Sequence, residues 1–463
     1  MLFRSVIEYN IDSLAELLRS LDFTHLFSNS RFHLLVDISE AELKQHILEL
    51  YKPVLYGGIR VIPLRSRVST EAQFFSQAGN AIQWTIDKIS GDYSVQAHFG
   101  KRWFSNIIRN IKNLDAIQNP LTSAERVAVT AAGPSLLLQV KDLCEKRKDL
   151  FLIATDTSLP CLLHEGIIPD AVVSIDCQHI SYYHFMEGLP EKVPLFLDLA
   201  SPPLLASLAK KRRFFSCGHP LTSYVSQSWE SITELDSSGG NVTYAAISLA
   251  EQMGASEIEL YGADYSYPMG VSYARGTYIY PFFEKKANRF SPLEAQASAF
   301  LFRTPLIKKS TNNFWYYETT TMSFYREKLE EKSYSLNAAI FAVKGMGAPI
   351  HVKAIEKWEA KQKPMANKSP SAAGTAACSS DNPLINPKQF LSEYSKNIKN
   401  LPSAGNYAAD YLTLLSGKEM TVFTTLLPAA AAIKRQHPDY NFRKLLKKTI
   451  DFCVTKIDKA LAQ

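Results

Sequence analysis

The sequence predicts an α/β protein with a central parallel β-sheet, an N-terminal α/β domain and a C-terminal helical domain. The first observation behind this prediction is a repeated rhythm of strand, turn and helix between Ala124 and about Tyr267. The second is a small-residue turn within VAVTAAGPSL that opens directly onto a helix-compatible stretch. The third is the length of 463 residues, which exceeds one ordinary domain and fits two or three.

Residues 1–120 are predicted to form the N-terminal α/β domain. The helix-like stretches there are AELKQHILEL and EAQFFSQAGNAIQWTIDKI, and the strand-like runs are HLLVDI and IRVIPL. A further helix-like stretch, WFSNIIRNIKNLDAI, leads into the next domain. We predict no chemistry for this part of the chain.

Residues 121–345 are predicted to form the central domain on short strands that are apolar on both faces. The candidate strands are VAVTA, LFLIATD, AVVSID, PLFLDLA, RFFSC and EIELYGA. Helix-compatible stretches separate them, which is typical of a parallel sheet covered by helices on both sides. Because a Rossmann-like sheet of this kind binds its ligand beyond the carboxyl ends of the strands, the polar residues at those ends matter most.

The composition changes after the last of these strands. An aromatic segment punctuated by Gly and Pro, SYPMGVSYARGTYIYPFFEKKANRF, predicts a loop or lid, and residues 290–345 return to helical composition. Residues 361–388 are rich in Ser, Ala, Pro and Lys, which predicts a flexible linker. Residues 389–463 are predicted to form the C-terminal helical domain, because their last stretch carries an apolar stripe at helical spacing.

The composition excludes several classes of protein. A net charge of +6 from 51 basic and 45 acidic residues is mild, and no nucleic-acid-binding motif accompanies it, so we expect no nucleic-acid partner. The six cysteines form no CxxC pair and lack zinc-type histidine spacing, which predicts reduced core residues and no metal site. No apolar stretch reaches the length of a membrane span, and the expected location is the cytoplasm.

The turn after the first central strand is the strongest candidate for a phosphate site. Ala131, Ala132 and Gly133 leave little side chain in the turn, so a ligand can approach the main chain. Pro134 suits a first helical position, and Ser135 offers a hydroxyl group at a helix N-terminus, where phosphates bind. The alternative is a tight strand-to-helix turn without a ligand, and this stretch alone does not decide between the two.

Carboxylates stand at the ends of three further strands. Asp156 and Asp176 follow successive strands, and Asp264 follows EIELYGA. Such carboxylates can hold a ribose, a base edge or a divalent cation. Asp156 would serve equally well as the N-cap of the helix that follows it.

Gly239, Gly240 and Asn241 precede another helix start, which predicts a second site for an anion or for sugar hydroxyl groups. The alternative is a glycine-rich turn with a helix cap. Because two small-residue turns and the strand-end aspartates belong to one predicted sheet, we expect a single ligand cleft along its carboxyl edge.

Residues 124–267 resemble the domain shared by archaeal MptE-type 6-hydroxymethylpterin diphosphokinases and bacterial Maf (motility-associated factor) flagellin glycosyltransferases. The matching pieces are AAGPSL, the stretch from Ala154 through GIIPDAVVSID, and GGNVTYAAISLAEQMGASEIELYGADYSY. The flanking N-terminal and C-terminal parts are similar to the Maf branch. The sequence has GADY where the family commonly has GQDL, and Tyr273 where a histidine often stands.

This resemblance implies a sialyltransferase-like central fold with a CMP-activated sugar as the donor. Carried over by position, the residues that would line the donor site are Gly133, Pro134, Ser135, Asp156, Asp176, Gly239, Gly240, Asn241, Asp264 and Tyr273. The resemblance also implies flagellin as the acceptor protein.

We therefore expect a glycosyltransferase that moves a nonulosonic acid, of the pseudaminic or legionaminic type, from a CMP-sugar to Ser or Thr of flagellin or another protein. Such a reaction needs a group that takes the acceptor proton, and His184 and His219 are candidates between which the sequence does not decide. Tyrosine hydroxyl groups from the aromatic segment, or a divalent metal, would stabilise the departing phosphate. Two alternatives stay open, an MptE-like diphosphokinase that uses ATP and Mg²⁺, and a non-catalytic nucleotide-binding or flagellar scaffold protein.

Overall fold

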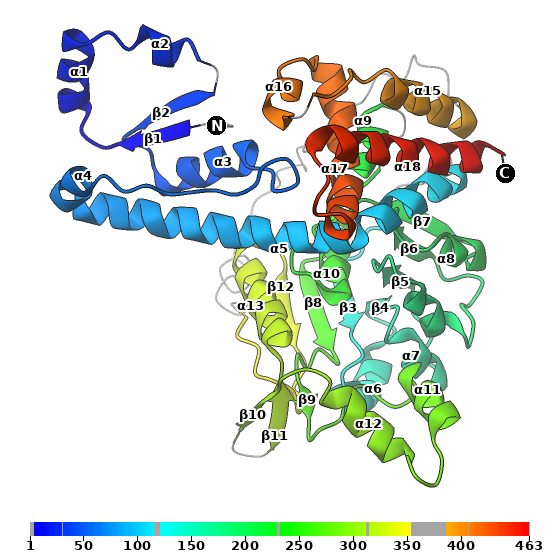
Figure 1. Ribbon diagram of the computed structural model, residues 1–463. Coiled ribbons are helices and arrows are strands. Elements are labelled where there is room, and N and C mark those ends of the chain that lie inside the picture. Colours follow the sequence, from blue (N-terminus) through cyan, green and yellow to red (C-terminus); the bar gives the residue numbers. More distant parts are fainter. Residues whose placement is uncertain are drawn as a thin grey trace, which may run out of the picture. The chain divides into compact units, whose positions relative to one another are not determined.

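The computed structural model describes residues 4–29, 31–114, 121–228, 232–311, 314–352, 386–405 and 407–462 (Figure 1). The chain divides into two compact units. One consists of Met1–Phe104 together with Leu391–Gln463, and the other of Ser105–Phe390. The linker predicted for residues 361–388 lies outside the described residues except for its last three positions.

A seven-stranded parallel sheet forms the centre of the second unit. Its strands, in spatial order, are β12 (Ala339–Ala342), β8 (Glu257–Tyr261), β3 (Arg126–Thr130), β4 (Phe151–Thr155), β5 (Ala171–Ser174), β6 (Leu195–Asp198) and β7 (Arg212–Phe215). The predicted α/β class and the six predicted strands are confirmed. The seventh strand, β12, lies in residues 290–345, for which the sequence predicted helical composition, so that part of the prediction was incomplete.

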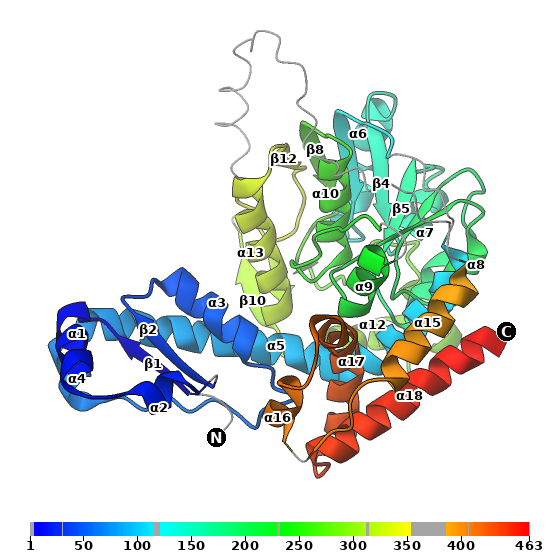
Figure 2. The same cartoon turned by 90° about the horizontal axis from the view of Figure 1, so that it is seen from above.

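The strands are buried because apolar residues face both sides of the sheet. On one face, Val127, Val129 and Ile153 pack with residues of α10 (Val242–Gln252) and with Leu329 of α13 (Thr320–Ser335). The connections between successive strands include α6 (Ser135–Lys146), α7 (Leu159–His164), α8 (Pro203–Leu208), the short helix η2 (His179–Phe185) and α9 (Pro220–Ser228). Figure 2 labels the strands β4, β5, β8 and β12 and the helices α10 and α13, and Figure 1 labels the remaining strands of the sheet.

The order of the strands creates a topological switch point between β3 and β8. From β3 the chain adds β4, β5, β6 and β7 in one direction, and it then returns to place β8 on the other side of β3. In open sheets of this kind, ligands bind outside the carboxyl ends of the strands at the switch point. A ligand site is therefore expected at the carboxyl edge of the sheet near β3 and β8.

The aromatic segment after β8 folds into defined elements. It contributes β9 (Tyr267–Pro268), which pairs with β11 (Trp315–Glu318), and β11 pairs with β10 (Ile307–Ser310). Helix α11 (Ile279–Lys286) lies in the same segment, and α12 (Leu293–Leu301) follows it. The backbone amide of Ala274 donates a 2.9 Å hydrogen bond to the carbonyl oxygen of Ala132, so the segment contacts the turn after β3.

The first unit contains a small parallel sheet and a set of helices. Its elements are β1 (Arg4–Glu8), α1 (Ile11–Ser20), α2 (Thr24–Phe27), β2 (Phe32–Val36), α3 (Glu40–Leu50), α4 (Arg65–Thr70), the first part of α5 (Ala72–Asn110), α15 (Pro387–Lys399), α16 (Ala408–Leu412), α17 (Gly417–Gln436) and α18 (Phe442–Ala462). The helical character of residues 389–463 is confirmed.

One detail of the predicted N-terminal domain was wrong. The run IRVIPL, residues 59–64, is not a strand, and Ile62 is 71% exposed there. The helix-like stretches EAQFFSQAGNAIQWTIDKI and WFSNIIRNIKNLDAI are confirmed as helical, and the continuous 39-residue helix α5 contains residues 72–89 of the first and 103–110 of the second. Among the described helices, none combines the length and the apolar character that a membrane crossing requires.

Candidate functional site

Carboxylates mark the carboxyl edge of the central sheet. Asp156 directly follows β4, Asp176 lies just beyond β5, and Asp264 lies just beyond β8. A fourth carboxylate, Asp198, is the last residue of β6. It was missed in the sequence because the predicted strand, PLFLDLA, extends beyond it. The structure thus places the three predicted carboxylates along one edge of one sheet.

The turn after β3 is closed by Asp264. The backbone amide of Ser135 donates a 2.8 Å hydrogen bond to Oδ2 of Asp264, and the amide of Gly133 donates a 2.9 Å bond to the carbonyl oxygen of Gly262. Gly133 is required because a Cβ atom there would overlap the Asp264 carboxylate. Pro134 occupies the N-cap position, and helix α6 begins at Ser135. An internal carboxylate therefore compensates the N-terminus of α6.

A glycine-containing loop after β12, residues 343–348, covers this turn. The amide of Met346 donates a 2.7 Å hydrogen bond to Oγ of Ser135, and the amide of Ala348 donates a 2.9 Å bond to the carbonyl oxygen of Asp264. A Cβ atom on Gly345 would overlap Ser135, so the loop can approach only with glycine at that position. This loop was not predicted. Its signal was the apolar run AAIFAV followed by KGMG, which parallels VAVTAAGPSL.

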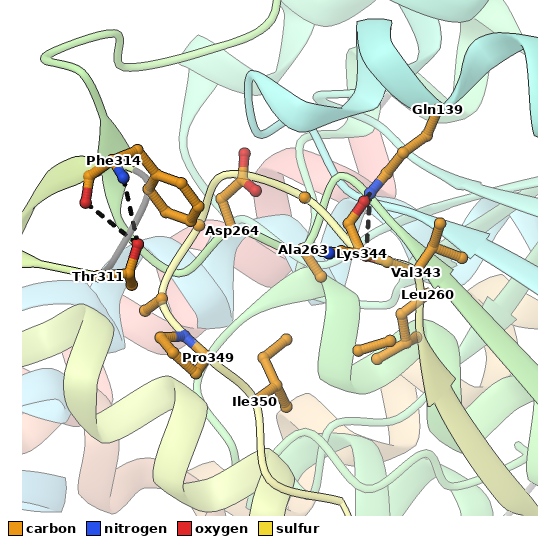
Figure 3. A pocket seen from close by; sticks show the side chains of 14 residues that line it. Gln139, Leu260, Ala263, Asp264, Thr311, Phe314, Val343, Lys344, Pro349 and Ile350 are labelled. Atoms are coloured by element: carbon orange, nitrogen blue, oxygen red, sulfur yellow. Dashed lines mark hydrogen bonds between the residues drawn. The ribbon is translucent and has the colours of Figure 1, made fainter.

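A pocket of about 570 Å³ opens beside this junction, at the carboxyl ends of β8 and β12 (Figure 3). Figure 3 shows Asp264 between Phe314 on one side and Gln139 on the other. Burial raises the pKa of the Asp264 carboxyl above its ordinary value, and its hydrogen bonds with Ser135 oppose that shift. The volume is in the range of small-molecule sites.

A second group of polar residues lies at the ends of β4 and β5. Oδ1 of Asp156 accepts hydrogen bonds from the amide and the hydroxyl of Thr157, and Oδ2 accepts a 2.6 Å bond from Oγ of Ser174. Asp176 accepts a 2.9 Å bond from the amide of Gln178. Burial raises the pKa of Asp176, and the charge of Asp156 adds to the shift. The hydrogen bonds of Asp156 with Thr157 thus lie within its own turn, and the N-cap of α7 is Ser158 rather than Asp156, so the alternative role of Asp156 as a helix cap was wrong. Of these two carboxylates, Asp176 is the one whose proton affinity the site increases.

Aromatic residues and one buried histidine surround these carboxylates. The ring of His184 lies 4.6 Å from the ring of Tyr278, edge to face, and Nδ1 of His184 is buried with no hydrogen-bond partner among the described residues. Burial raises the pKa of Tyr273 and of Tyr278, the charge of Asp156 adds to both shifts, and the charge of Arg303 opposes both. Tyr273 therefore lies within electrostatic range of Asp156; a single ligand cleft that includes both residues stays a prediction. Arg303 was not predicted.

A carboxylate and a histidine pair at the next strand. Nε2 of His219 lies 2.9 Å from Oδ2 of Asp198, and the amide of Cys217 donates a 3.3 Å hydrogen bond to Oδ1 of the same carboxylate. Asp198 is 1% exposed. A buried carboxylate that orients an imidazole is a common arrangement in acid–base catalysis.

Gly239, Gly240 and Asn241 form the turn before α10. The side chain of Asn241 caps the helix, because its Oδ1 accepts a 3.0 Å hydrogen bond from the amide of Tyr244. Gly240 has φ of +75°, a backbone conformation that favours glycine, and a Cβ atom on Gly239 would overlap the ring of Tyr244. Their hydrogen bonds in the described chain run within this turn and the first turn of α10, which gives these residues a structural role; ligand contact by them stays a prediction.

In the described ranges, no three His, Cys, Asp or Glu side chains are arranged so that they could hold a metal ion.

Comparisons with known proteins agree with the predicted resemblance. Residues 101–270 match the family described as 6-hydroxymethylpterin diphosphokinase MptE-like. An uncharacterized protein of Treponema pallidum (strain Nichols) is 30% identical over 168 residues, which are 35% of this chain and 78% of that protein. A second uncharacterized protein of the same strain is 33% identical over 152 residues, 32% of this chain and 54% of that protein.

A solved structure matches the whole chain. The structure of the Maf glycosyltransferase from Magnetospirillum magneticum AMB-1 aligns with a TM-score of 0.56 at 14% sequence identity, covering 100% of this chain and 74% of that one. At 14% sequence identity, the match establishes that the two proteins share a fold. The resemblance predicted from the sequence is thus confirmed: through residues 101–270 the chain belongs to the MptE-like family, and its fold is that of a Maf glycosyltransferase.

Proposed function

We propose that this protein is a glycosyltransferase that moves a nonulosonic acid, of the pseudaminic or legionaminic type, from a CMP-sugar to Ser or Thr of flagellin or another protein. The observation that carries the proposal is the fold shared with a Maf glycosyltransferase over the whole chain. The group of Asp176, His184, Tyr273 and Tyr278 at the carboxyl edge supports it, because such residues suit proton transfer and phosphate stabilisation. The cytoplasmic location expected from the sequence is part of this proposal.

The proposed reaction forms two bonds and breaks two. The acceptor hydroxyl oxygen forms a bond to the anomeric carbon of the sugar, and the bond from that carbon to the phosphate oxygen breaks with its electron pair leaving on CMP. The hydroxyl proton passes to a base, and Asp176, whose proton affinity burial increases, is positioned beside His184 to take it. Tyr278 and Arg303 would stabilise the charge that develops on the phosphate.

A second candidate function is diphosphate transfer from ATP to a hydroxymethylpterin. The family match over residues 101–270 favours it. That reaction uses Mg²⁺ held by carboxylates, and Asp156 and Asp176 are the described carboxylates of the edge whose charges interact. Both oxygens of Asp156 already accept hydrogen bonds from the protein, so this pair fits a cation less well than it fits proton transfer.

A binding panel separates these functions. The full chain is titrated calorimetrically with CMP, CDP, GDP, AMP and ATP, each with and without Mg²⁺. Selective binding of CMP supports glycosyl transfer, and Mg²⁺-dependent binding of ATP supports diphosphate transfer. Failure of all five nucleotides to bind would leave the scaffold alternative and contradict both enzymatic functions.

The acceptor protein is proposed to contact the C-terminal helices. On α18, Lys447 and Lys448 are exposed beside the buried Leu445 and Leu446. Reversal of both charges with Lys447→Glu and Lys448→Glu should weaken capture of flagellin and leave CMP binding unchanged. Deleting residues 389–463 is a poorer test, because residues of α17 pack with Ala97 of α5 in one core.

A further inference from the structure

The connection between α11 and α12, two helices labelled in Figure 1, carries an exposed aromatic ring. Phe290 in this connection is 95% exposed, and Phe282 on α11 is 43% exposed. A single exposed apolar side chain is common on protein surfaces, so the surroundings of Phe290 decide what its ring can do.

The turn that holds Phe290 is ordered by its own hydrogen bonds. The amide of Asn288 donates a 3.0 Å bond to the carbonyl oxygen of Ser291, and the amide of Ser291 donates a 3.1 Å bond to the carbonyl oxygen of Asn288. Oδ1 of Asn288 also accepts a 3.0 Å bond from the amide of Phe290, a common arrangement in tight turns. The backbone is thus ordered before any partner arrives, which lowers the entropic cost of binding through Phe290.

Positive charge surrounds this ring in the sequence. Three exposed basic residues lie close to it in the chain, and they are Lys285, Lys286 and Arg289. Within residues 279–292, Glu284 is the only acidic residue. In the described part of the chain, none of the three cations forms a salt bridge. Instead, Nζ of Lys286 lies 4.0 Å from the centre of the Phe282 ring, so this apolar surface already has a cation over it.

The ring of Phe290 stands at the end of a packed pair of helices. The ring of Phe283 on α11 lies 5.7 Å from the ring of Phe300 on α12, which fixes the two helices against each other. At 95% exposure, Phe290 has no protein surface beside it. Anchor residues of protein interfaces lie instead within well-packed patches of about 800 Å² per partner. A lipid bilayer requires no such patch, because the lipids close around an inserted side chain.

We propose that this tip binds the surface of an anionic lipid bilayer. The tip consists of Phe282, Lys285, Lys286, Arg289 and Phe290. The Phe290 ring inserts at the boundary between the head groups and the acyl chains, and the cations lie against the lipid phosphates. Binding is reversible, because one inserted ring and a few charges supply far less free energy than a membrane-spanning helix. The proposal goes beyond the transferase function and does not depend on it.

The electrostatic part is tested by sedimenting the full chain with vesicles. Vesicles of equal parts phosphatidylcholine and phosphatidylglycerol should bind the protein, pure phosphatidylcholine vesicles should not, and added salt should weaken binding. Arg289→Glu should reduce binding to the anionic vesicles at least about fivefold, because each basic residue near such a surface contributes about that factor. Lys211→Glu changes the net charge equally at another exposed lysine and should have a much smaller effect.

The contribution of the ring is tested with matched aromatic residues. Phe290→Ala should weaken binding to the anionic vesicles about tenfold, because the variant cannot bury an aromatic ring in lipid. The control is Phe324→Ala on α13, at a ring that is 46% exposed and has Nζ of Lys328 5.6 Å from its centre. Phe324 thus also combines a ring with a cation but lies on a regular helix, and its loss should leave binding unchanged.

Insertion is measured with tryptophan at the same two positions. Brominated acyl chains should quench the emission of Phe290→Trp more strongly than that of Phe324→Trp. Equal quenching of the two variants, failure of the wild-type chain to bind anionic vesicles, or wild-type affinity in Phe290→Ala or in Arg289→Glu would each overturn the proposal. Vesicle binding that is lost only in the Lys447→Glu and Lys448→Glu double variant would overturn it as well and assign the membrane contact to α18.

Discussion

The amide of Ser135 donates a 2.8 Å hydrogen bond to the carboxylate of Asp264, which joins the first turn of α6 to the loop after β8 across the switch point of the sheet. The N-terminus of α6 is a place where phosphates commonly bind, and here a carboxylate of the protein occupies it. The side chain of Asp264 therefore has two roles. It fixes the turn that the sequence predicted as a phosphate site, and it lies in the lining of the neighbouring pocket.

The glycine loop over Ser135 and Asp264 should be intolerant of side chains. A Cβ atom on Gly347 would overlap the Cα and carbonyl oxygen of Asp264, which are backbone atoms and cannot turn aside. Gly347→Ala should therefore lower the free energy of unfolding by about 1–3 kcal/mol in urea denaturation. Gly417→Ala is the matched control, since a Cβ atom there meets nothing within 4 Å. Equal stability of the two variants would contradict the described packing of the loop.

Asn241 should act as a helix cap. Asn241→Ala removes the acceptor for the amide of Tyr244 and should lower the free energy of unfolding by about 0.5–2 kcal/mol. Asn241→Asp should restore most of this loss, because aspartate caps helices equally well. A variant Asn241→Ala with wild-type stability and no CMP affinity would instead support the ligand contact that the sequence predicted.

Asp236 should give the protein a distinct loss of stability in acid. Burial raises its pKa, but hydrogen bonds from Ser238 and the contact with Lys332, at 2.9 Å, outweigh burial and lower the pKa to about 2 from the ordinary 3.8. A lowered pKa in the folded state stabilises the protein above the ordinary pKa, and this stabilisation is lost as the pH falls from about 4 to about 2.

Asp236→Asn should therefore flatten the dependence of unfolding free energy on pH in that window. The control Asp149→Asn changes an exposed carboxylate and should keep the wild-type slope. An unchanged slope in Asp236→Asn would show that the pair with Lys332 does not control the titration.

Asp176 should be required for transfer and dispensable for CMP binding. Asp176→Asn removes the proton acceptor, and general base catalysis contributes about 10²–10⁴-fold, so the transfer rate should fall by that factor. Because burial raises the pKa of Asp176, the wild-type rate should fall on acidification through that raised pKa as the carboxylate becomes protonated. Glu187→Gln, at an exposed carboxylate nearby in the chain, is the control. A transfer rate unaffected by Asp176→Asn would remove Asp176 from the mechanism.

Local sequence patterns predicted six strands of the central sheet and missed the outermost strand, β12. The six predicted strands are runs of apolar residues that the sheet buries on both faces, so their signal is local. The strand β12 has four residues at the border of the sheet and follows a helix, which hid it. IRVIPL has the composition of a strand, but composition alone does not supply a partner strand.

Site residues that follow a strand could be predicted from the sequence. Contacts between residues that are far apart in the sequence could not. Asp156, Asp176 and Asp264 could be placed at strand ends because each follows an apolar run. The bond between Ser135 and Asp264 joins residues 129 positions apart, and the pair of Asp198 and His219 depends on the pairing of β6 with β7. Those contacts follow from the order of strands in the sheet, which no single stretch of sequence contains.

The central claim is glycosyl transfer to a protein from a CMP-activated nonulosonic acid, and mass spectrometry of flagellin tests it most directly. Flagellin is isolated from cells that lack this protein and from the same cells complemented with the wild-type chain or with Asp176→Asn. The account predicts a mass increment of nonulosonate size on Ser or Thr that requires the wild-type chain and is absent with Asp176→Asn. Flagellin of identical mass in all three strains would contradict the account.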